Sequence, residues 1–292
     1  VLAGLSAVLF TVAIDGASRI FFGLNPSSAR LVLVPFLISI ASGLLLVKVF
    51  PDVRGSGVPQ TKAAFHLHAG SIPARIPLGK FIMGVLCVGS GHSMGREGPS
   101  VQIGAGIASI VARWTGLPSS RAKELLPIGV AGALAAAFNT PIAAVLFALE
   151  EIIGDMNATL LGSTVVASVT AVIVERAILG NEPLFHVPPY HLEHAAELLG
   201  YAVLGIVGGF VSVAFCKGLL GARAGFLRLP FWTRPYQPAI GGAIIGVLLL
   251  GRWLEEKPGD KPALDPANVS VAHSGTTPLS DLESKTIQNE SA

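Results

Sequence analysis

Long runs of apolar residues alternate with short polar or Gly/Pro-rich interruptions along most of the chain. A helix needs about 20 predominantly apolar residues to cross the hydrocarbon core of a bilayer. Five segments approach that length, near residues 1–22, 31–50, 158–180, 197–220 and 236–254. The pattern therefore predicts a helical protein that crosses a membrane several times.

The stretch between residues 72 and 153 is also apolar, but glycines and prolines break it repeatedly. Pieces such as Ser100–Trp114 and Ile142–Ile153 are too short to cross a bilayer comfortably. Short, interrupted apolar segments indicate the binding site of a transporter, because irregular backbone at membrane depth must line a cavity or be buried in protein. The alternative is kinked helices packed through small residues. That alternative fits the GxxxG spacings Gly91–Gly95, Gly205–Gly209 and Gly242–Gly246.

Two further segments lie outside this apolar pattern. Residues 183–196 are predicted to form an extramembrane loop. From residue 255 onward the chain is polar and rich in Pro, Ser and Thr, which is typical of disorder. We therefore expect a membrane domain over residues 1–254 and a disordered tail over residues 255–292. The first residue is Val1, within an apolar run, so we expect the N-terminus to be cut from something longer.

Composition narrows the class of protein. Hydrophobic residues make up 51% of the 292 residues, charged residues only 13%, and the mean hydropathy is +0.66. Soluble domains carry about 25% charged residues, so the chain is predicted to be an integral membrane protein. A net charge of +2 is too small to indicate binding to nucleic acid. Cys87 and Cys216 both lie in apolar runs, which favours buried thiols over a disulfide or a redox pair.

The first polar motif is GSGVPQTK, Gly55 to Lys62, directly after the second apolar run. Glycines on both sides of Ser56 let the backbone approach a ligand closely and adopt positive φ. Pro59 suits the first turn of a following helix. A helix start with free N–H groups and a serine hydroxyl can bind an anion. The alternative is an ordinary loop in which Ser56 caps the helix.

The second motif is GREGP, in which Glu97 is followed by Gly98, Pro99 and a helical pattern. Free N–H groups at a helix start favour an anion. A carboxylate at this position can occupy an anion site and leave it when protonated. Ionisable residues inside an apolar region are functional candidates by default. The alternative is an Arg96–Glu97 ion pair at a membrane surface.

The third motif is FNTPIAAVLFALEEII, Phe138 to Ile153. Asn139 before Pro141 predicts another helix start. That helix ends in Glu150 and Glu151, although the C-terminus of a helix favours positive charge. A carboxylate held there suits a group that takes up and releases protons, and only one of the two needs to face the interior. The alternative is a solvated helix end at the membrane edge.

Other candidate chemistry is sparse. His66-x-His68 and His191-x-x-His194 have spacings that a metal ion can use, but no cysteine or carboxylate cluster completes either site. The sequence contains no phosphate-binding GxxxxGK[ST] loop, nucleophile elbow or dinucleotide fingerprint. We therefore expect no metal site, no cofactor and no enzymatic activity.

Taken in order, GSGVP, GREGP and AAAFNTPIAAVLFALEE resemble motifs of the CLC family of chloride channels and chloride/proton antiporters. The segment GVPQTKAAFHLHAGSIPARIPLGK is similar to bacterial members, and the resemblance covers Val1 to Trp253. It implies an all-α integral membrane fold of tilted and broken transmembrane helices. The chain is expected to form the first of the two inverted-topology halves of such a transporter.

The resemblance implies a chloride site and a gate. The hydroxyl of Ser56 would coordinate the central chloride, and a serine here implies chloride, because members that prefer nitrate have proline. The chain at Gly57, Arg96, Glu97 and Gly98 would line the anion pathway. The carboxylate of Glu97 would act as the gate, competing with chloride and swinging away when protonated.

The same resemblance implies a second proton site. Glu151 matches the internal proton-transfer glutamate of the family, a position at which channel members generally lack a carboxylate. The predicted function is therefore chloride/proton exchange. A passive, voltage-gated-type chloride channel is the alternative within transport, and Glu151 is the feature that opposes it.

The chain departs from the family pattern in its second half. The family has a GxFxP motif and a tyrosine there that completes the chloride site, whereas this sequence has no GxFxP, and Tyr190, Tyr201 and Tyr236 lie in other contexts. A truncated, non-transporting fragment or partner subunit is therefore another alternative.

The resemblance finally implies the partners of the chain. It implies a homodimer with part of the interface on Ile142–Leu179, in a lipid bilayer, with chloride and protons as substrates. A multi-pass protein of a bacterial inner membrane is expected.

Overall fold

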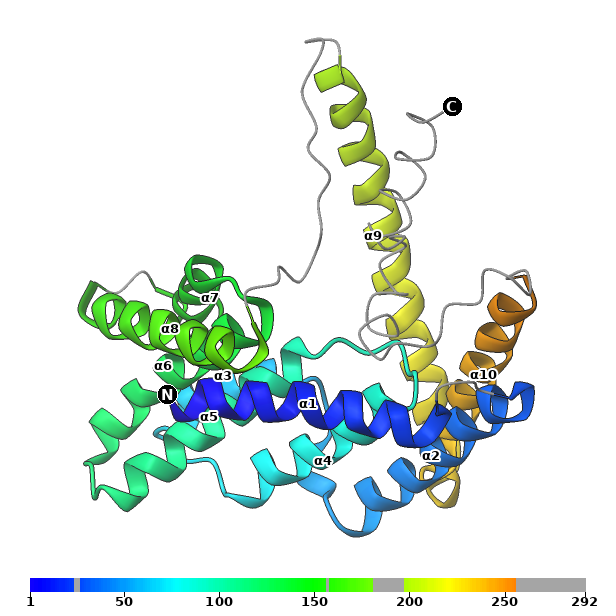
Figure 1. The fold of residues 1–292 in the computed structure, drawn as a ribbon, viewed down its shortest axis with the longest axis horizontal. Coiled ribbons are helices and arrows are strands. Elements are labelled where there is room, and N and C mark those ends of the chain that lie inside the picture. The colour runs from blue at the N-terminus through cyan, green and yellow to red at the C-terminus, as the bar shows by residue number, and fades with distance from the viewer. Residues whose placement is uncertain (24–26, 156–157, 181–196, 256–292) are drawn as a thin grey trace, which may run out of the picture.

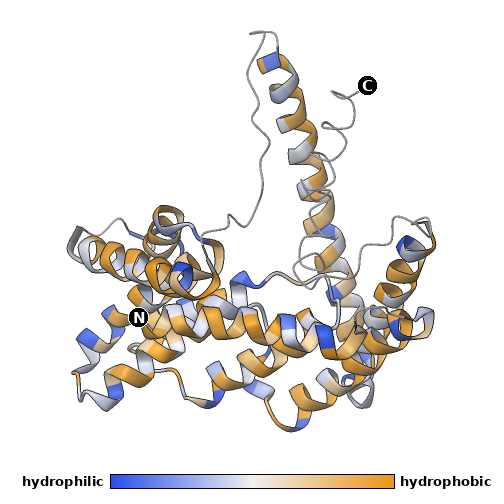
Figure 2. Cartoon of the chain, viewed as in Figure 1, coloured by the Kyte–Doolittle hydropathy of each residue, from blue (hydrophilic) through white to orange (hydrophobic). Residues whose placement is uncertain are grey.

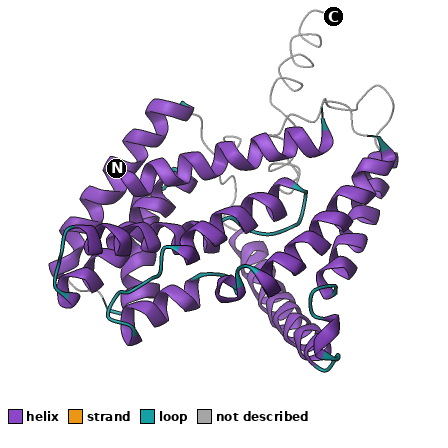
Figure 3. Ribbon diagram, turned by 90° about the horizontal axis from the view of Figure 1, so that it is seen from below, coloured by secondary structure: helices purple, strands orange, loops and turns teal. Residues whose placement is uncertain are grey.

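The structure is a computed structural model that describes residues 1–23, 27–155, 158–180 and 197–255. Within those residues every regular element is helical (Figure 3). Five helices are long and apolar enough to cross a membrane: α1 (Leu2–Phe22), α2 (Ser28–Lys48), α8 (Ala158–Leu179), α9 (Glu197–Leu227) and α10 (Gln237–Glu255). They coincide with the five predicted spans, which are therefore confirmed as long apolar helices, and their hydropathy is visible in Figure 2. The predicted loop 183–196 and the tail beyond residue 255 lie outside the described residues.

The interrupted region folds into shorter helices between the first two spans and α8. In chain order these are the 3₁₀ turn η1 (Pro51–Val53), α3 (Val58–Leu67), α4 (Arg75–Gly89), α5 (Glu97–Trp114), α6 (Ser119–Phe138), α7 (Pro141–Phe147) and the π-helical segment η2 (Ala148–Ile153). A further 3₁₀ turn, η3 (Phe231–Thr233), precedes α10. The breaks fall where the sequence places them, because Pro59 and Pro141 lie in the first turns of α3 and α7.

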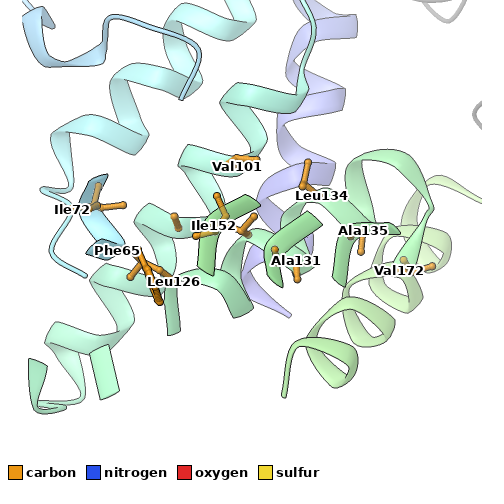
Figure 4. Packing of buried hydrophobic residues seen from close by; sticks show 14 residues of the cluster. Phe65, Ile72, Val101, Leu126, Ala131, Leu134, Ala135, Ile152 and Val172 are labelled. Carbon is orange, nitrogen blue, oxygen red and sulfur yellow. The ribbon is translucent and has the colours of Figure 1, made fainter. Parts of the chain in front are cut away.

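Helix α6 is the centre of the packing and contacts α5, α8, α1 and α7. Its residues 129–137 are all buried, and most of them are alanine or glycine. Gly104 of α5 and Gly129 of α6 face each other so closely that a Cβ on either would overlap the carbonyl of the other. The largest hydrophobic cluster joins α6 to α3, α5, α7, η2 and α8, including Phe65, Leu126 and Ile152 (Figure 4).

The three GxxxG spacings have different structural roles. Gly242 and Gly246 pack α10 against α2, where a Cβ would overlap Ser39 or the backbone of Val32, so packing through small residues is confirmed at this pair. The helix-packing interpretation is wrong for Gly91 and Gly95, because both lie in the loop between α4 and α5. Around Gly205 and Gly209 of α9, no described atom lies within 4 Å of an added Cβ.

Helix α9 projects away from the other helices (Figure 1). It has 31 residues, and none of them is buried. Its apolar side chains, such as Phe210 and Phe215, are therefore exposed along almost its whole length.

Candidate functional site

The two glycine motifs that the sequence analysis selected meet in space. A Cβ on Gly98 would overlap the carbonyl group of Ser56, and a Cβ on Gly57 would overlap the carbonyl group of Gly98. The loops therefore touch backbone to backbone, although they are about 40 residues apart in the sequence. Glycine is required at both positions by this close approach, and Gly57 also has a φ of 115°, which other residues rarely adopt.

This contact brings two helix starts together. Gly57 precedes the first residue of α3, and Glu97 is the first residue of α5. The first N–H groups of a helix have no carbonyl partner within it and carry partial positive charge, so both starts favour an anion. Ser56 and Glu97 are exposed, one beside each helix start. The carboxylate of Glu97 folds back over Gly95, where an added Cβ would overlap it.

The Ser56 loop is held from two sides by residues that the sequence analysis did not select. The Nζ of the buried Lys80 donates to the carbonyls of Val53 and Gly55, at 2.9 and 2.7 Å. Gln60 accepts from the N–H of Gly57 and donates to the carbonyl of Arg54, both at 2.9 Å. A signal for Lys80 was available, since a lysine within the apolar run IPLGKFIMGV is an ionisable residue in a membrane-like segment.

Arg96 is anchored within the protein and does not form a surface ion pair with its neighbour. Its guanidinium carbon lies 5.3 Å from the ring centroid of Phe138, a cation–π geometry. Burial lowers the pKa of Arg96, and the carboxyl groups of Asp15, Glu97 and Glu175 act in the opposite direction. Among the described residues no carboxylate lies within 4.0 Å of Arg96, so the alternative of an Arg96–Glu97 ion pair is not what the structure contains.

The third motif begins and ends as the sequence predicted. Asn139 adopts the left-handed conformation that ends α6, and α7 starts at Pro141. The helix then widens into η2, which contains both carboxylates. Single π turns inside helices are frequent at functional sites.

Of these two carboxylates, only Glu151 turns toward a neighbouring helix. Its Oε1 lies 3.4 Å from Nζ of Lys62 on α3, in a half-exposed ion pair, whereas Glu150 is exposed. On the same side of α3, Nε2 of His66 lies 3.1 Å from the carbonyl oxygen of Ile152. Helix α3 therefore has the Ser56 loop at its start and the Glu151 segment beside its later turns.

The structure describes no cluster of three or more His, Cys, Asp or Glu side chains able to hold a metal within residues 1–23, 27–155, 158–180 and 197–255. His66 contacts a backbone carbonyl, and the pair His191/His194 lies outside the described residues. Cys87 and Cys216 are free thiols.

Comparison with known proteins gives the family. A family model described as voltage gated chloride channel matches residues 36–285. The chain belongs to this CLC family. The fold agrees: a solved slow cyanobacterial Cl⁻/H⁺ antiporter superposes with a TM-score of 0.74 at 26% identity, covering 85% of this chain and 61% of that one. A CLC-type fluoride/proton antiporter gives 0.64 at 27% identity, covering 87% and 64%.

Curated CLC relatives include the H(+)/Cl(-) exchange transporter ClcA of Vibrio campbellii, which is 32% identical over 85% of this chain and 56% of the relative. The protein of the same name from Cronobacter sakazakii is also 32% identical, over 87% of this chain and 57% of its own length. The chain thus spans about half the length of the curated relatives that it matches. It is a membrane protein of a transporter and channel family, all-α in its described part, as the sequence analysis predicted.

Proposed function

We propose that the chain takes part in chloride/proton exchange across a membrane. The observation that carries the proposal is the contact between the Ser56 and Gly98 loops, which brings the starts of α3 and α5 together. Two helix starts with a hydroxyl and a carboxylate beside them form a site in which chloride and the carboxylate can compete.

In this proposal Ser56 supplies a hydroxyl to chloride. The chain at Gly57, Arg96, Glu97 and Gly98 lines the pathway. The carboxylate of Glu97 occupies the anion site when ionised. Protonation neutralises it, so that chloride replaces it, and each turnover thereby links one carboxyl proton to anion movement.

Glu151 is the proposed inner proton site. The ion pair with Lys62 supports this role, because it holds the carboxylate of Glu151 against α3, whereas the carboxylate of Glu150 is exposed. Two relatives named H(+)/Cl(-) exchange transporters and a solved Cl⁻/H⁺ antiporter support exchange over passive conduction. The alternative is a passive channel, which would be favoured if the unaltered chain moved chloride but no protons.

A second candidate function is that of a non-transporting partner subunit. The exposed α9 favours it, because a 31-residue apolar helix without a buried residue has an unfilled packing surface. Under this candidate the chain co-purifies with a longer CLC protein.

We infer the membrane in which the proposed exchange takes place from the relatives, which are bacterial proteins. We place the chain in a bacterial inner membrane, as a homodimer with α7 and α8 at the interface, and with chloride and protons as substrates. The proposed exchange requires no cofactor, because the hydroxyl, the carboxylates and the helix starts supply all of the chemistry.

The test is chloride efflux from liposomes that contain the purified chain, with external pH recorded simultaneously. Exchange predicts chloride leaving as protons move the opposite way. Glu151→Ala is expected to abolish the proton movement and keep the chloride flux. Glu150→Ala, which changes the exposed neighbouring carboxylate, is the matched control and is expected to behave as the unaltered chain.

Chloride flux without protons in the unaltered chain would assign the channel. Absence of flux, together with recovery of a longer CLC protein from the native membrane, would assign the partner subunit. Proton movement that persists in Glu151→Ala would remove Glu151 from the mechanism.

A further inference from the structure

A polar cluster outside the proposed chloride site lies just before the GREGP motif. His92, in the loop between α4 and α5, lies between two serine hydroxyls that are almost completely buried. Its Nε2 is 2.6 Å from Oγ of Ser39 on α2, and its Nδ1 is 2.9 Å from Oγ of Ser90 at the end of α4. We call these three residues the histidine cluster.

A neutral His92 can bond to both serines in either tautomer. One ring nitrogen then donates to a serine oxygen, and the other accepts from a serine hydroxyl. When Nδ1 carries the proton, the hydroxyl of Ser90 donates to the carbonyl of Cys87, 3.0 Å away. Both ring nitrogens of a neutral His92 are satisfied in this arrangement.

The histidine cluster holds one end of the loop that carries Arg96 and Glu97. The backbone N–H of His92 donates to the carbonyl of Cys87 at 3.2 Å, which joins the loop to the last turn of α4. At the other end, Arg96 is held over Phe138. Residues 93–95 between these two anchors are exposed. The position of the Glu97 carboxyl thus depends on two anchors about four residues apart.

We infer that His92 is a positioning residue for the loop that carries Arg96 and Glu97, and that protonation of its imidazole releases this loop from α2. The inference rests on the proposed function in one respect, because release of the loop affects transport only if Glu97 gates the pathway.

The hydrogen bonds of the histidine cluster indicate that the loop is released when His92 gains a proton. A protonated ring would donate from both nitrogens and force the serine that had donated to the neutral ring to turn its hydroxyl elsewhere, and it would place a cation between buried serines. Among the described residues no carboxylate lies within 4.0 Å of the ring to compensate it. Burial lowers the pKa of His92 below its usual range, opposed by the carbonyl of Cys87.

The elements around the ring also contain charged and titratable groups. Cys87 of α4 contacts His92 through its backbone carbonyl, and the turn of α1 that contains Asp15 packs against Gly89. The others are Arg19 on α1, Arg30 and Lys48 on α2, Arg75 and Lys80 on α4, Arg96 and Glu97 at the start of α5, and Arg252 on α10. A released His92 protonates at about pH 6.5, whereas the held ring resists protonation. Lowering the pH through about 6.5 therefore favours the released loop, by linkage.

The test is amide hydrogen exchange of residues 91–97 in the full chain in lipid nanodiscs, from pH 5 to 8, corrected for intrinsic rates. At pH 7.5 the loop of the unaltered chain is expected to be protected. His92→Phe keeps a ring but loses both hydrogen bonds, and Ser39→Ala loses one. Each is expected to raise exchange of the loop by about threefold to tenfold, the range that a lost hydrogen bond corresponds to.

The pH profile distinguishes positioning from simple packing. In the unaltered chain the protection is expected to fall as the pH drops below about 6.5, whereas His92→Phe and His92→Gln lack this step. His92→Gln, which keeps a side chain able to donate and accept, is expected to retain part of the protection. His68→Phe, an exposed histidine at the end of α3, is the control and is expected to leave the loop unchanged.

Unchanged exchange in His92→Phe, or a pH step that persists in it, would overturn the inference. The same variants in the liposome assay separate it from the proposed function. If the unaltered chain transports nothing, the proposed function fails, while hydrogen exchange still decides the role of His92.

Discussion

Lys80 shows how a single charged residue supports the candidate site from within an apolar helix. Its ammonium group donates to two carbonyls of the Ser56 loop, and the side chain is buried. The carbonyls of Val53 and Gly55 replace part of the hydration that the ammonium group loses on burial.

These two hydrogen bonds predict that Lys80 stabilises the fold around the Ser56 loop. Lys80→Met keeps an unbranched side chain but loses both bonds, so it is expected to lower the free energy of unfolding by about 1–3 kcal/mol. The measurement is thermal unfolding of both proteins in detergent at pH 7.

Lys123→Met is the matched control, because Lys123 packs over the ring of Phe65 on another part of α3. It is expected to leave the Ser56 loop unaffected and to destabilise the protein less than Lys80→Met does. Equal stability of Lys80→Met and the unaltered chain would show that the two hydrogen bonds of Lys80 do not hold the fold.

At the scale of elements, the packing of α10 on α2 depends on backbone contact. A Cβ on Gly246 would lie 2.9 Å from both Cα and O of Val32, whereas Gly241, five residues earlier and on a different face of the helix, has no such neighbour. Small residues at helix contacts let backbones approach closely, and van der Waals contact then holds the pair together in a membrane.

Gly246→Leu is expected to separate α10 from α2 and to lower the free energy of unfolding by about 1–3 kcal/mol, the usual effect of overpacking. Gly241→Leu introduces the same side chain on the exposed side of the same helix and is expected to have no such effect. Thermal unfolding in nanodiscs measures both. Equal destabilisation by the two substitutions would mean that helix propensity or lipid contact, not the α2–α10 contact, decides the stability of α10.

At the scale of the whole molecule, the helix ends define two faces with different charge. The end of α2 meets the start of α4, where Arg75 donates to the carbonyl of Val49. The start of α6 lies on the same face, since Gly70 packs against the backbone of Lys123. Cations gather on this face at Lys48, Arg54, Arg75, Arg113, Arg121 and Lys123, and fewer lie at the opposite helix ends, at Arg19, Arg30, Arg176 and Arg252.

An excess of Lys and Arg marks the cytoplasmic side of membrane proteins, so the face that contains Lys48 and Lys123 is predicted to be cytoplasmic. In a background without the native cysteines, Ser27→Cys and Ser119→Cys place single thiols at exposed positions on opposite faces. A membrane-impermeant thiol reagent added to intact cells is expected to label Ser27→Cys and to leave Ser119→Cys unlabelled until the membrane is opened. The reverse labelling pattern would invert the predicted orientation.

The sequence predicted the membrane-spanning helices well because their signal is local. Hydropathy over about 20 residues is a property of each segment alone, and α1, α2, α8, α9 and α10 agree with it. The helix starts could be predicted for the same reason, because Pro141 and the residues before it favour a helix start wherever they occur. Predictions from GxxxG spacing were less reliable, since the spacing at Gly91 and Gly95 occurs in a loop and carries no information about a partner.

By itself the sequence determined which segments are helical, where they break and which polar motifs lie at those breaks, because these properties depend on neighbours within a few turns. Only the tertiary structure decided that Gly98 touches the Ser56 loop, that Glu151 and not Glu150 meets Lys62, and that Lys80 and His92 hold the two loops. Each of these contacts joins residues more than 20 positions apart. Such contacts depend on how helices stack and on the close approach that small residues permit, and no local pattern encodes them.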